Sequence, residues 1–273
     1  MPDTFLPLST TDINRERRSA LLASAGAALL ALSPAVGRAN ETNSATSSGS
    51  AASVSWNSVD PDANDDNLIV PIYDEPRHHV IMENGVMRVM RVMIPPGHAT
   101  LWHAQNLDFV NTIIGGSHNI IARKGEGPGE PVEMKTGSVR YGDYQRSPIV
   151  DRVSNVGTTL NHQIAFEITD LARRNYGNAD RSHATNFSVI LDKPHVRGWR
   201  LKLQPGETTP VYRQDGPGIR VVLSGARLID RRPGELGQQI SLRPGDALFT
   251  TPGLIAVTNA AEEPLEIMEY ELR

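Results

Sequence analysis

The sequence predicts an all-β chain built from two tandem modules. Short apolar runs alternate with turn signals rich in Gly, Pro and Asp along most of its length. One run, Trp199 to Gln204, alternates apolar and polar residues with the two-residue period of a strand that has one wet face. The second half of the chain also repeats the first. Many short strands at this spacing are typical of a β-sandwich or barrel.

An internal repeat divides the body of the chain into two copies of one β module. Without a gap, the segment RVMIPPGHATLWHAQNLDFVNTIIGG faces RLKLQPGETTPVYRQDGPGIRVVLSG, and a second block follows in the same order. The matched pairs are Pro96 with Pro205, Gly97 with Gly206, Thr100 with Thr209, Gln105 with Gln214, Gly116 with Gly225, Ile120 with Ile229, Gly137 with Gly245, Tyr141 with Phe249, Val153 with Val257, Asn155 with Asn259, and Phe166 with Tyr270. Two ordered blocks predict a duplicated unit.

Residues 1–39 are predicted to be a cleavable export signal. The pair Arg17 and Arg18 precedes an apolar run from Ala20 to Ala31, and small residues follow as far as Ala39. The segment RRSALL resembles the twin-arginine type of signal. The mature protein is therefore expected in the periplasm or outside the cell, with cleavage near Ala39.

The remainder of the chain divides at changes in composition. Residues 40–67 are rich in Ser, Ala, Asn and Asp and are expected to form a flexible linker. The two modules are expected at residues 68–170 and 188–273, separated by a linker at 171–187. A short piece from Ile168 to Arg174 is the one segment beyond the signal whose pattern looks helical.

The composition of the chain narrows the classes of partner that it is expected to bind. The chain has 27 Lys and Arg against 31 Asp and Glu, with no basic block, which argues against nucleic acid and against an anionic membrane surface. It has no cysteine, which excludes thiolate metal sites, disulfides and a cysteine nucleophile. The expected partner is a small molecule of unknown identity, without a stable membrane anchor. A homodimer remains open.

The repeated blocks resemble the two sequence motifs of the cupin superfamily. The resemblance rests on PPG and QPGE before the first motif, on IIGG and VLSGA after it, and on VSNVGTT and VTNAAEEP late in each second motif. It covers residues 68–273. It implies two tandem cupin-type jelly-roll β-barrels, the arrangement of a bicupin.

The resemblance also implies a metal site. In the family the first motif is approximately G-x5-H-x-H-x3-4-E-x6-G, the second carries one more histidine, and the four ligands hold Mn, Fe, Ni, Cu or Zn. Residues two apart on a strand point the same way, so H-x-H aims two imidazoles at one interior point. In the first copy these positions hold His103, Gln105, Phe109 and Asp151. One histidine of the three survives.

Two neighbouring residues and the second copy complete the comparison with the motif. Asp108 is a candidate substitute carboxylate for metal, although strand parity turns it outward when Phe109 and Asn111 face inward. Asn111 then becomes a candidate ligand-binding residue. In the second copy the four positions hold Tyr212, Gln214, Gly218 and Ile255, so this copy is expected to be structural.

Three functions remain open from the sequence. The first is an exported bicupin with a degenerate metal site that binds a small molecule through His103, Gln105, Asn111 and Asp151, or that is structural. The second is a metal-dependent oxygenase or isomerase whose divalent transition metal is held by His103, Gln105, Asp151 and Asp108, or a ligand not identified. The third is a metal-free lyase or isomerase with His103 as general base. The cofactor is unknown.

The export signal can be tested directly. Replacement of both Arg17 and Arg18 by Lys is expected to trap the precursor in the cytoplasm, because the twin-arginine pathway reads this pair. Cell fractionation with immunodetection of precursor and mature forms checks the outcome. Unchanged export of the variant would refute the twin-arginine assignment.

Overall fold

The computed structural model describes residues 67–127, 129–169 and 175–273. The predicted signal, the predicted linker up to residue 66, and residues 170–174 of the expected helical piece lie outside these residues. Ile168 itself is the last residue of a strand. Within the described residues, no helix has the length and apolar character needed to cross a bilayer.

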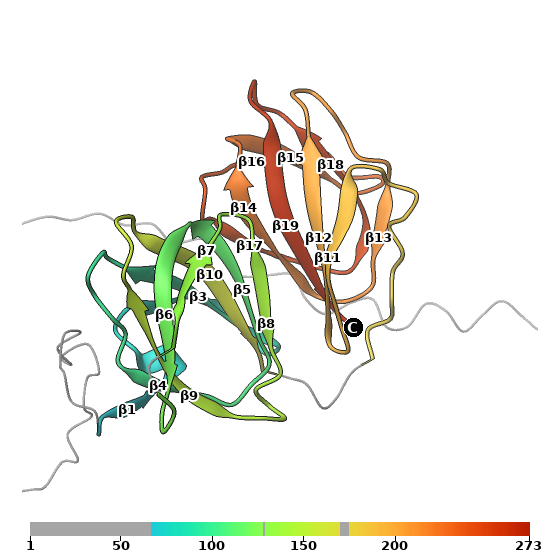
Figure 1. The fold of residues 1–273 in the computed structure, drawn as a ribbon. Coiled ribbons are helices and arrows are strands. Elements are labelled where there is room, and N and C mark those ends of the chain that lie inside the picture. The colour runs from blue at the N-terminus through green and yellow to red at the C-terminus, as the bar shows by residue number, and fades with distance from the viewer. Residues whose placement is uncertain (1–66, 128, 170–174) are drawn as a thin grey trace, which may run out of the picture. The chain divides into compact units, whose positions relative to one another are not determined.

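The first module has two five-stranded sheets (Figure 1). One sheet has the order β1-β4-β9-β6-β7 and the other β2-β3-β10-β5-β8. The elements are β1 (Ile69–Pro71), the short 3-10 helix η2 (Ile72–Asp74), β2 (His78–Glu83), β3 (Met87–Ile94), β4 (Trp102–Gln105), β5 (Phe109–Gly115), β6 (Ser117–Arg123), β7 (Pro131–Met134), β8 (Val139–Gly142), β9 (Ile149–Asn155) and β10 (Asn161–Ile168).

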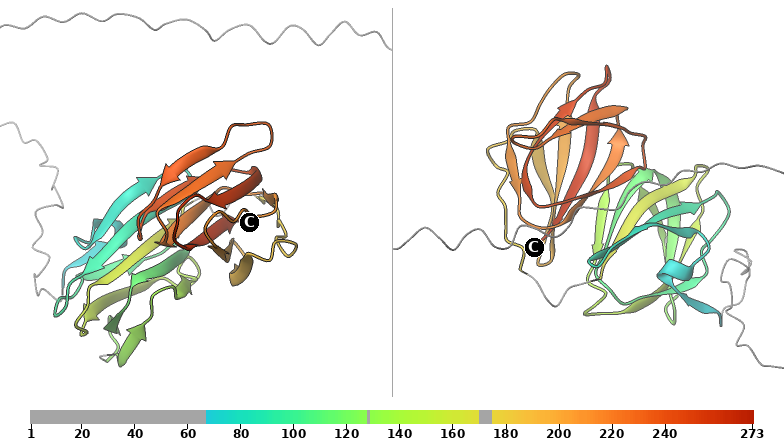
Figure 2. Two further views of the ribbon diagram at one scale, coloured as in Figure 1. Left: turned by 90° about the horizontal axis from the view of Figure 1, so that it is seen from above. Right: turned by 180° about the vertical axis from the view of Figure 1, so that it is seen from behind.

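The second module repeats this plan with a sheet of five strands and a sheet of four, in the orders β11-β12-β19-β14-β17 and β13-β18-β15-β16. Its strands are β11 (Phe187–Lys193), β12 (Val196–Leu203), β13 (Tyr212–Gln214), β14 (Gly218–Ser224), β15 (Arg227–Arg231), β16 (Gln238–Ser241), β17 (Ala247–Thr250), β18 (Gly253–Asn259) and β19 (Leu265–Leu272). The strand β11 begins at Phe187, the last residue of the predicted linker. Figure 2 shows the layered strands from above and from behind.

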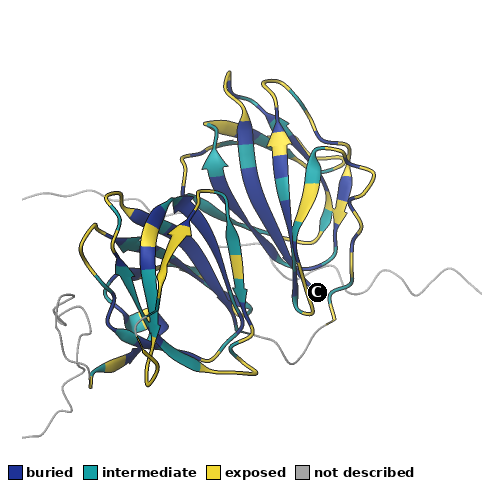
Figure 3. Cartoon of the chain, in the orientation of Figure 1, coloured by how far each residue is buried: buried dark blue, intermediate teal, exposed yellow. Residues whose placement is uncertain are grey.

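The architecture confirms the predicted fold class of tandem jelly rolls. The central strands of both modules are buried and the loops at their ends are exposed (Figure 3). In β12, Trp199, Leu201 and Leu203 are buried while Lys202 between them is exposed, as the alternating sequence requires. The side-chain period of two therefore decides which residues reach the interior.

The matched asparagines Asn155 and Asn259 hold equivalent loops in the two modules. The amide nitrogen Nδ2 of Asn155 donates to the carbonyls of Ile94 and Thr159, at 2.8 Å each. In the second module Nδ2 of Asn259 donates to the carbonyls of Leu203 (3.2 Å) and Glu263 (2.7 Å). Both asparagines are buried. The repeat therefore preserves the same backbone-to-side-chain bonds.

The matched turn and threonine positions agree as well. Gly97 and Gly206 adopt φ of 78° and 74°, in the left-handed region that favours glycine. The hydroxyl of Thr100 accepts a hydrogen bond from the amide of Val153 at 2.9 Å, and that of Thr209 accepts one from the amide of Val257 at 3.0 Å. These shared contacts give a physical reason for the pairs that define the repeat.

The two modules share part of one hydrophobic core. Phe166 of the first module packs edge-on against Tyr270 of the second, with ring centroids 5.3 Å apart. The hydroxyls of Tyr270 and Thr112 lie 2.6 Å apart in a hydrogen bond. The buried cluster around them also draws Val110 from the first module and Val221 from the second. The polar tip of Tyr270 is thus satisfied within an apolar interface.

Replacement of Asn259 by Ala is expected to destabilise the chain. The carbonyls of the buried Leu203 and the exposed Glu263 lose their donor, and the orphaned buried group costs about 1–3 kcal/mol. Urea unfolding followed by circular dichroism measures the change, with the exposed Asn178→Ala variant as control. Equal midpoints for the two variants would contradict a structural role for Asn259.

Candidate functional site

A pocket of about 440 Å³ lies between the two sheets of the first module. Its walls come from β3, β5, β8 and β10 on one side and from β4, β6 and β9 on the other. The polar and aromatic residues that line it are His78, His103, Gln105, Phe109, Asn111, Arg123, Arg140, Tyr141, Asp143, Tyr144, Ser147, Asp151 and Gln163. The remaining walls are apolar, as expected for a ligand-binding cavity.

His103 and Asp151 form a buried pair on the wall of this pocket. They are cross-strand neighbours on β4 and β9, so their side chains share one face. Nε2 of His103 lies 3.0 Å from Oδ1 of Asp151, and Nδ1 lies 3.0 Å from the carbonyl oxygen of Leu101. Both ring nitrogens face acceptors. The ring can therefore donate from both nitrogens when it is protonated, and neither nitrogen is left free for a ligand.

The protonation of this pair follows from its surroundings. Burial disfavours the charged form of His103, but the hydrogen bond and charge of Asp151 outweigh it and raise the pKa of the imidazole. Burial likewise opposes the ionised form of Asp151, but His103 and the amide of Gln105 lower the pKa of the carboxyl group. Each partner thus stabilises the charge of the other.

Gln105 and Asn111 add amide groups to the same pocket. Nε2 of Gln105 donates to Oδ1 of Asp151 at 2.9 Å, which fixes the orientation of this amide because the carboxylate only accepts. Nδ2 of Asn111 donates to Oε1 of Gln163 at 2.6 Å. The remaining oxygens, Oε1 of Gln105 and Oδ1 of Asn111, are buried and have no hydrogen-bond partner.

A chain of amides continues from Asn111 across the interior. Gln163 donates to Asn161, and Asn161 donates to Asn119, with nitrogen-to-oxygen distances of 2.9 Å each. These four residues come from β5, β10 and β6, so the chain joins the two sheets. The interior of the first module is thus polar and largely neutral around its pocket.

The residues do not fit the metal site that the cupin resemblance implies. His103 offers no free ring nitrogen, Gln105 directs its NH2 group toward Asp151, and Phe109 has no donor atom. Within the described residues, no group of three histidine or carboxylate side chains has a geometry that would hold a metal ion. A transition-metal site needs more nitrogen or charge at one point than this set supplies.

Asp108 lies apart from the other sequence-predicted residues. It is buried in the loop between β4 and β5, and its Oδ2 accepts a hydrogen bond of 2.7 Å from the hydroxyl of Tyr141. It does not line the pocket, whereas Phe109 and Asn111 do. The structure thus brings together His103, Gln105, Asn111 and Asp151 and leaves Asp108 out, as strand parity indicates.

His78 and Glu75 also belong to this site, and the sequence analysis did not single out either of them. His78 lines the pocket with its ring centroid 4.9 Å from that of His103. Its Nδ1 donates to Oε2 of Glu75 at 2.6 Å. Burial lowers the pKa of His78 more than Glu75 raises it, so the ring is neutral. His78 lies on β2 and pairs with Val92 of β3, another residue that lines the pocket.

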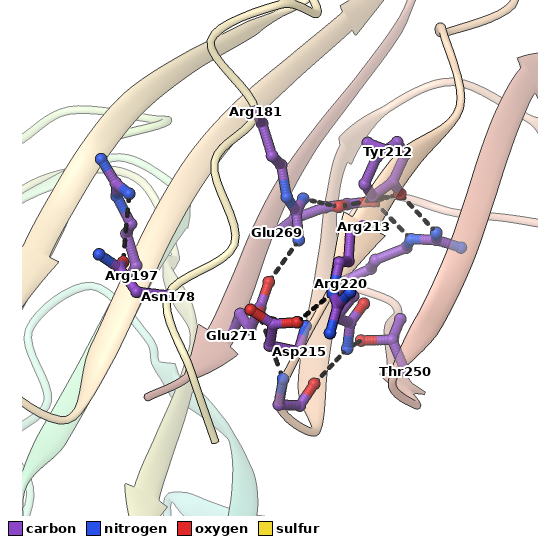
Figure 4. Close-up of polar contacts among 12 residues, drawn as sticks. Asn178, Arg181, Arg197, Tyr212, Arg213, Asp215, Arg220, Thr250, Glu269 and Glu271 are labelled. Atoms are coloured by element: carbon purple, nitrogen blue, oxygen red, sulfur yellow. Dashed lines mark hydrogen bonds and ion pairs between the residues drawn. The ribbon is translucent and has the colours of Figure 1, made fainter. Parts of the chain in front are cut away.

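In the second module an ionic network fills the corresponding interior. Tyr212, which matches His103, points its hydroxyl at Glu269, 3.0 Å away (Figure 4). Nε of Arg220 donates to Glu269 at 2.6 Å, and its Nη1 donates to Asp230 at 2.7 Å. Arg220 occupies the place that Asn111 has in the first repeat, and the side chain is 1% exposed. Its guanidinium thus lies where the first module has its pocket wall.

A second arginine completes this network. Arg181 donates to Glu269 at 2.5 Å and to Glu271 at 2.8 Å (Figure 4). Its guanidinium lies 3.9 Å from the ring centroid of Trp199. Of the other motif positions, Gln214 donates to Thr250, Gly218 has no side chain and Ile255 belongs to the hydrophobic core. Within the described residues, these positions supply no histidine or carboxylate, and the structural role expected for this module stays a prediction.

The comparisons with known proteins bear on the fold. No protein-family model and no curated protein matches the sequence. Among solved structures, AerE from Microcystis aeruginosa is 8% identical with a TM-score of 0.51, over 73% of this chain and 98% of that chain. Salicylate 1,2-dioxygenase from Pseudoaminobacter salicylatoxidans, with gentisate, is 14% identical with a TM-score of 0.49, over 70% of each chain.

A third similar structure is the cupin 2 conserved barrel domain protein from Leptotrichia buccalis. It is 9% identical with a TM-score of 0.45, over 72% of this chain and 88% of that chain. At identities this low, structural likeness shows the fold alone. Function has to be argued from the site.

Replacement of Arg220 by Met is expected to lower the free energy of unfolding by about 3–5 kcal/mol, because Glu269 and Asp230 lose a buried counter-charge. Chemical denaturation measures the loss, with the exposed Arg227→Met variant as control. Adding Glu269→Leu to Arg220→Met should recover part of the stability. Equal stability of Arg220→Met and the control would refute the role of this ion pair.

The His103–Asp151 pair predicts a dependence of stability on pH. The raised pKa of His103 makes its contribution complete below the usual value of 6.5, and this contribution is lost as pH rises through the folded-state pKa. The lowered pKa of Asp151 makes its contribution complete above the usual value of 3.8, with loss as pH falls through the folded-state pKa. The stabilisation is therefore largest between 3.8 and 6.5.

Urea unfolding of the wild type and of His103→Gln, from mildly acidic to mildly alkaline pH, tests this dependence. The difference between the two is expected to shrink as the solution becomes alkaline. His79→Gln serves as a control, because the neighbouring His79 is exposed. A difference that does not change with pH would show that His103 is neutral in the folded protein.

Proposed function

We propose that the protein binds a small polar molecule in the pocket of the first jelly roll, without a transition metal. The observation that carries this proposal is the pair of buried, unpartnered amide oxygens of Gln105 and Asn111 beside a pocket of about 440 Å³. An unpaired buried acceptor costs free energy, and a ligand donor that reaches it recovers that cost. The pocket is thus suited to a molecule that carries hydrogen-bond donors.

The geometry of His103 favours binding over acid–base catalysis by this residue. A general base needs a lone pair within reach of the substrate, and both ring nitrogens of His103 are taken by Asp151 and Leu101. The pair instead orients Gln105 and keeps the wall of the pocket rigid. In this proposal the second module supports the fold.

The export signal belongs to the same proposal. A mature chain that begins near Asn40 would meet its ligand in the periplasm or outside the cell. The absence of cysteine suits an oxidising compartment, since no thiol is available for unwanted disulfides. Retention of the folded protein in the cytoplasm would remove this part of the proposal and leave the pocket unaffected.

Elemental analysis tests whether the pocket holds a transition metal. Protein purified without chelator is expected to contain well under one transition-metal ion per chain, and His103→Ala is expected to give the same content, because the wild-type imidazole has no free ring nitrogen. Gln214→Ala in the second module serves as a control for nonspecific metal. A near-stoichiometric metal in the wild type that disappears in His103→Ala would overturn the proposal.

A further inference from the structure

We propose that the ligand of this pocket is an open-chain hydroxy acid, with its carboxylate at the rim and its hydroxyl groups toward Gln105 and Asn111. This inference rests on the proposed function, because it names the class of molecule that the same pocket takes. It is carried by the distribution of charged and neutral groups around the pocket.

The rim of the pocket carries two arginines available to an anion. Arg123 on β6 and Arg140 on β8 both line the pocket and are exposed, and they come from different sheets. Within the described residues, neither guanidinium forms an ion pair or hydrogen bond with a protein group. Against these two cations stands one rim carboxylate, that of Asp143. A guanidinium binds a carboxylate through paired N–H donors, so the rim favours an acidic group.

The strand register connects the rim to the buried wall. Arg123 is the cross-strand neighbour of Asp151, which is in turn the neighbour of His103, so the three form one row over β6, β9 and β4. Arg140 is the cross-strand neighbour of Asn111. Two strand spacings correspond to about 10 Å. A small extended acid is therefore long enough to reach the amides from the rim.

The buried wall favours hydroxyl groups over an ammonium group. The free acceptors at this wall, Oε1 of Gln105 and Oδ1 of Asn111, are neutral amide oxygens. The carboxylate of Asp151 is already paired with His103 and also accepts from Gln105, both at Oδ1. Glu75 accepts from the backbone amides of Arg77 and Leu101 as well as from His78. A buried ammonium needs an unpaired carboxylate, whereas a hydroxyl needs one acceptor.

A matched six-carbon series tests this assignment on the full chain. D-gluconate carries a carboxylate and hydroxyls, sorbitol carries hydroxyls alone, and hexanoate carries a carboxylate alone. By isothermal titration calorimetry, gluconate is expected to bind about tenfold more tightly than either of the other two, because only gluconate engages both the rim and the wall. Added salt should weaken the binding of gluconate and leave the binding of sorbitol unchanged.

Variants assign the two ends of the ligand. Arg123→Gln with Arg140→Gln should reduce the affinity for gluconate to that for sorbitol, whereas the control Arg227→Gln should leave it unchanged. Gln105→Met should lower the affinity for gluconate and for sorbitol and leave the affinity for hexanoate unchanged. Equal gluconate affinity in all variants would place binding elsewhere and overturn the inference.

The outcomes separate this inference from the proposed function. If sorbitol or hexanoate binds as tightly as gluconate, or D-glucosaminate binds more tightly, the hydroxy-acid class is wrong and the binding pocket stands. If neither gluconate nor the shorter acid glycerate binds, the hydroxy-acid class is likewise wrong. A stoichiometric metal that depends on His103 would overturn the proposed function itself.

Discussion

Every polar side chain that turns into a jelly-roll interior has to find a partner there, and this constraint shapes both modules. In the second module Arg220 and Glu269 satisfy it with a direct ion pair at 2.6 Å. In the first module the smaller Asn111 takes the place of Arg220, and its amide leaves one oxygen unpaired. The difference in side-chain length and charge at this one repeat position distinguishes an interior held by ion pairs from one lined by neutral amides.

The same constraint explains the behaviour of His103. A histidine at a cupin ligand position needs a free lone pair to coordinate a metal, but here Asp151 and the Leu101 carbonyl occupy both ring nitrogens. Asp151, which stands at the late histidine position of the motif, is thus the hydrogen-bond partner of His103. The site becomes an electrostatic pair with amides around it, so its chemistry has to be argued from these residues and not from the fold.

The sequence predicted the fold and the pocket side of β4 well, because both follow from periodicity. Gln105 lies two residues after His103 on the same strand, so alternation places both side chains on one face. His78 was beyond such reasoning, because burial along β2 does not alternate: His78 is buried, whereas His79 and Val80 are both exposed. Arg220 was within reach: it is the lone charge in an apolar strand and matches Asn111, which was already expected to face inward.

The charged interior of the second module also bears on the stoichiometry of ligand binding by this chain. Two copies of one β module would ordinarily offer two equivalent cavities, but Arg220 occupies the interior of one of them. The second module does have a pocket of about 400 Å³, but Arg220, Asp230 and Glu235 line it, so the two pockets are not equivalent. A ligand that fits only the first pocket saturates the chain at one molecule and gives a simple hyperbolic curve. Cooperative binding, if it were observed, would have to arise between chains and not within one.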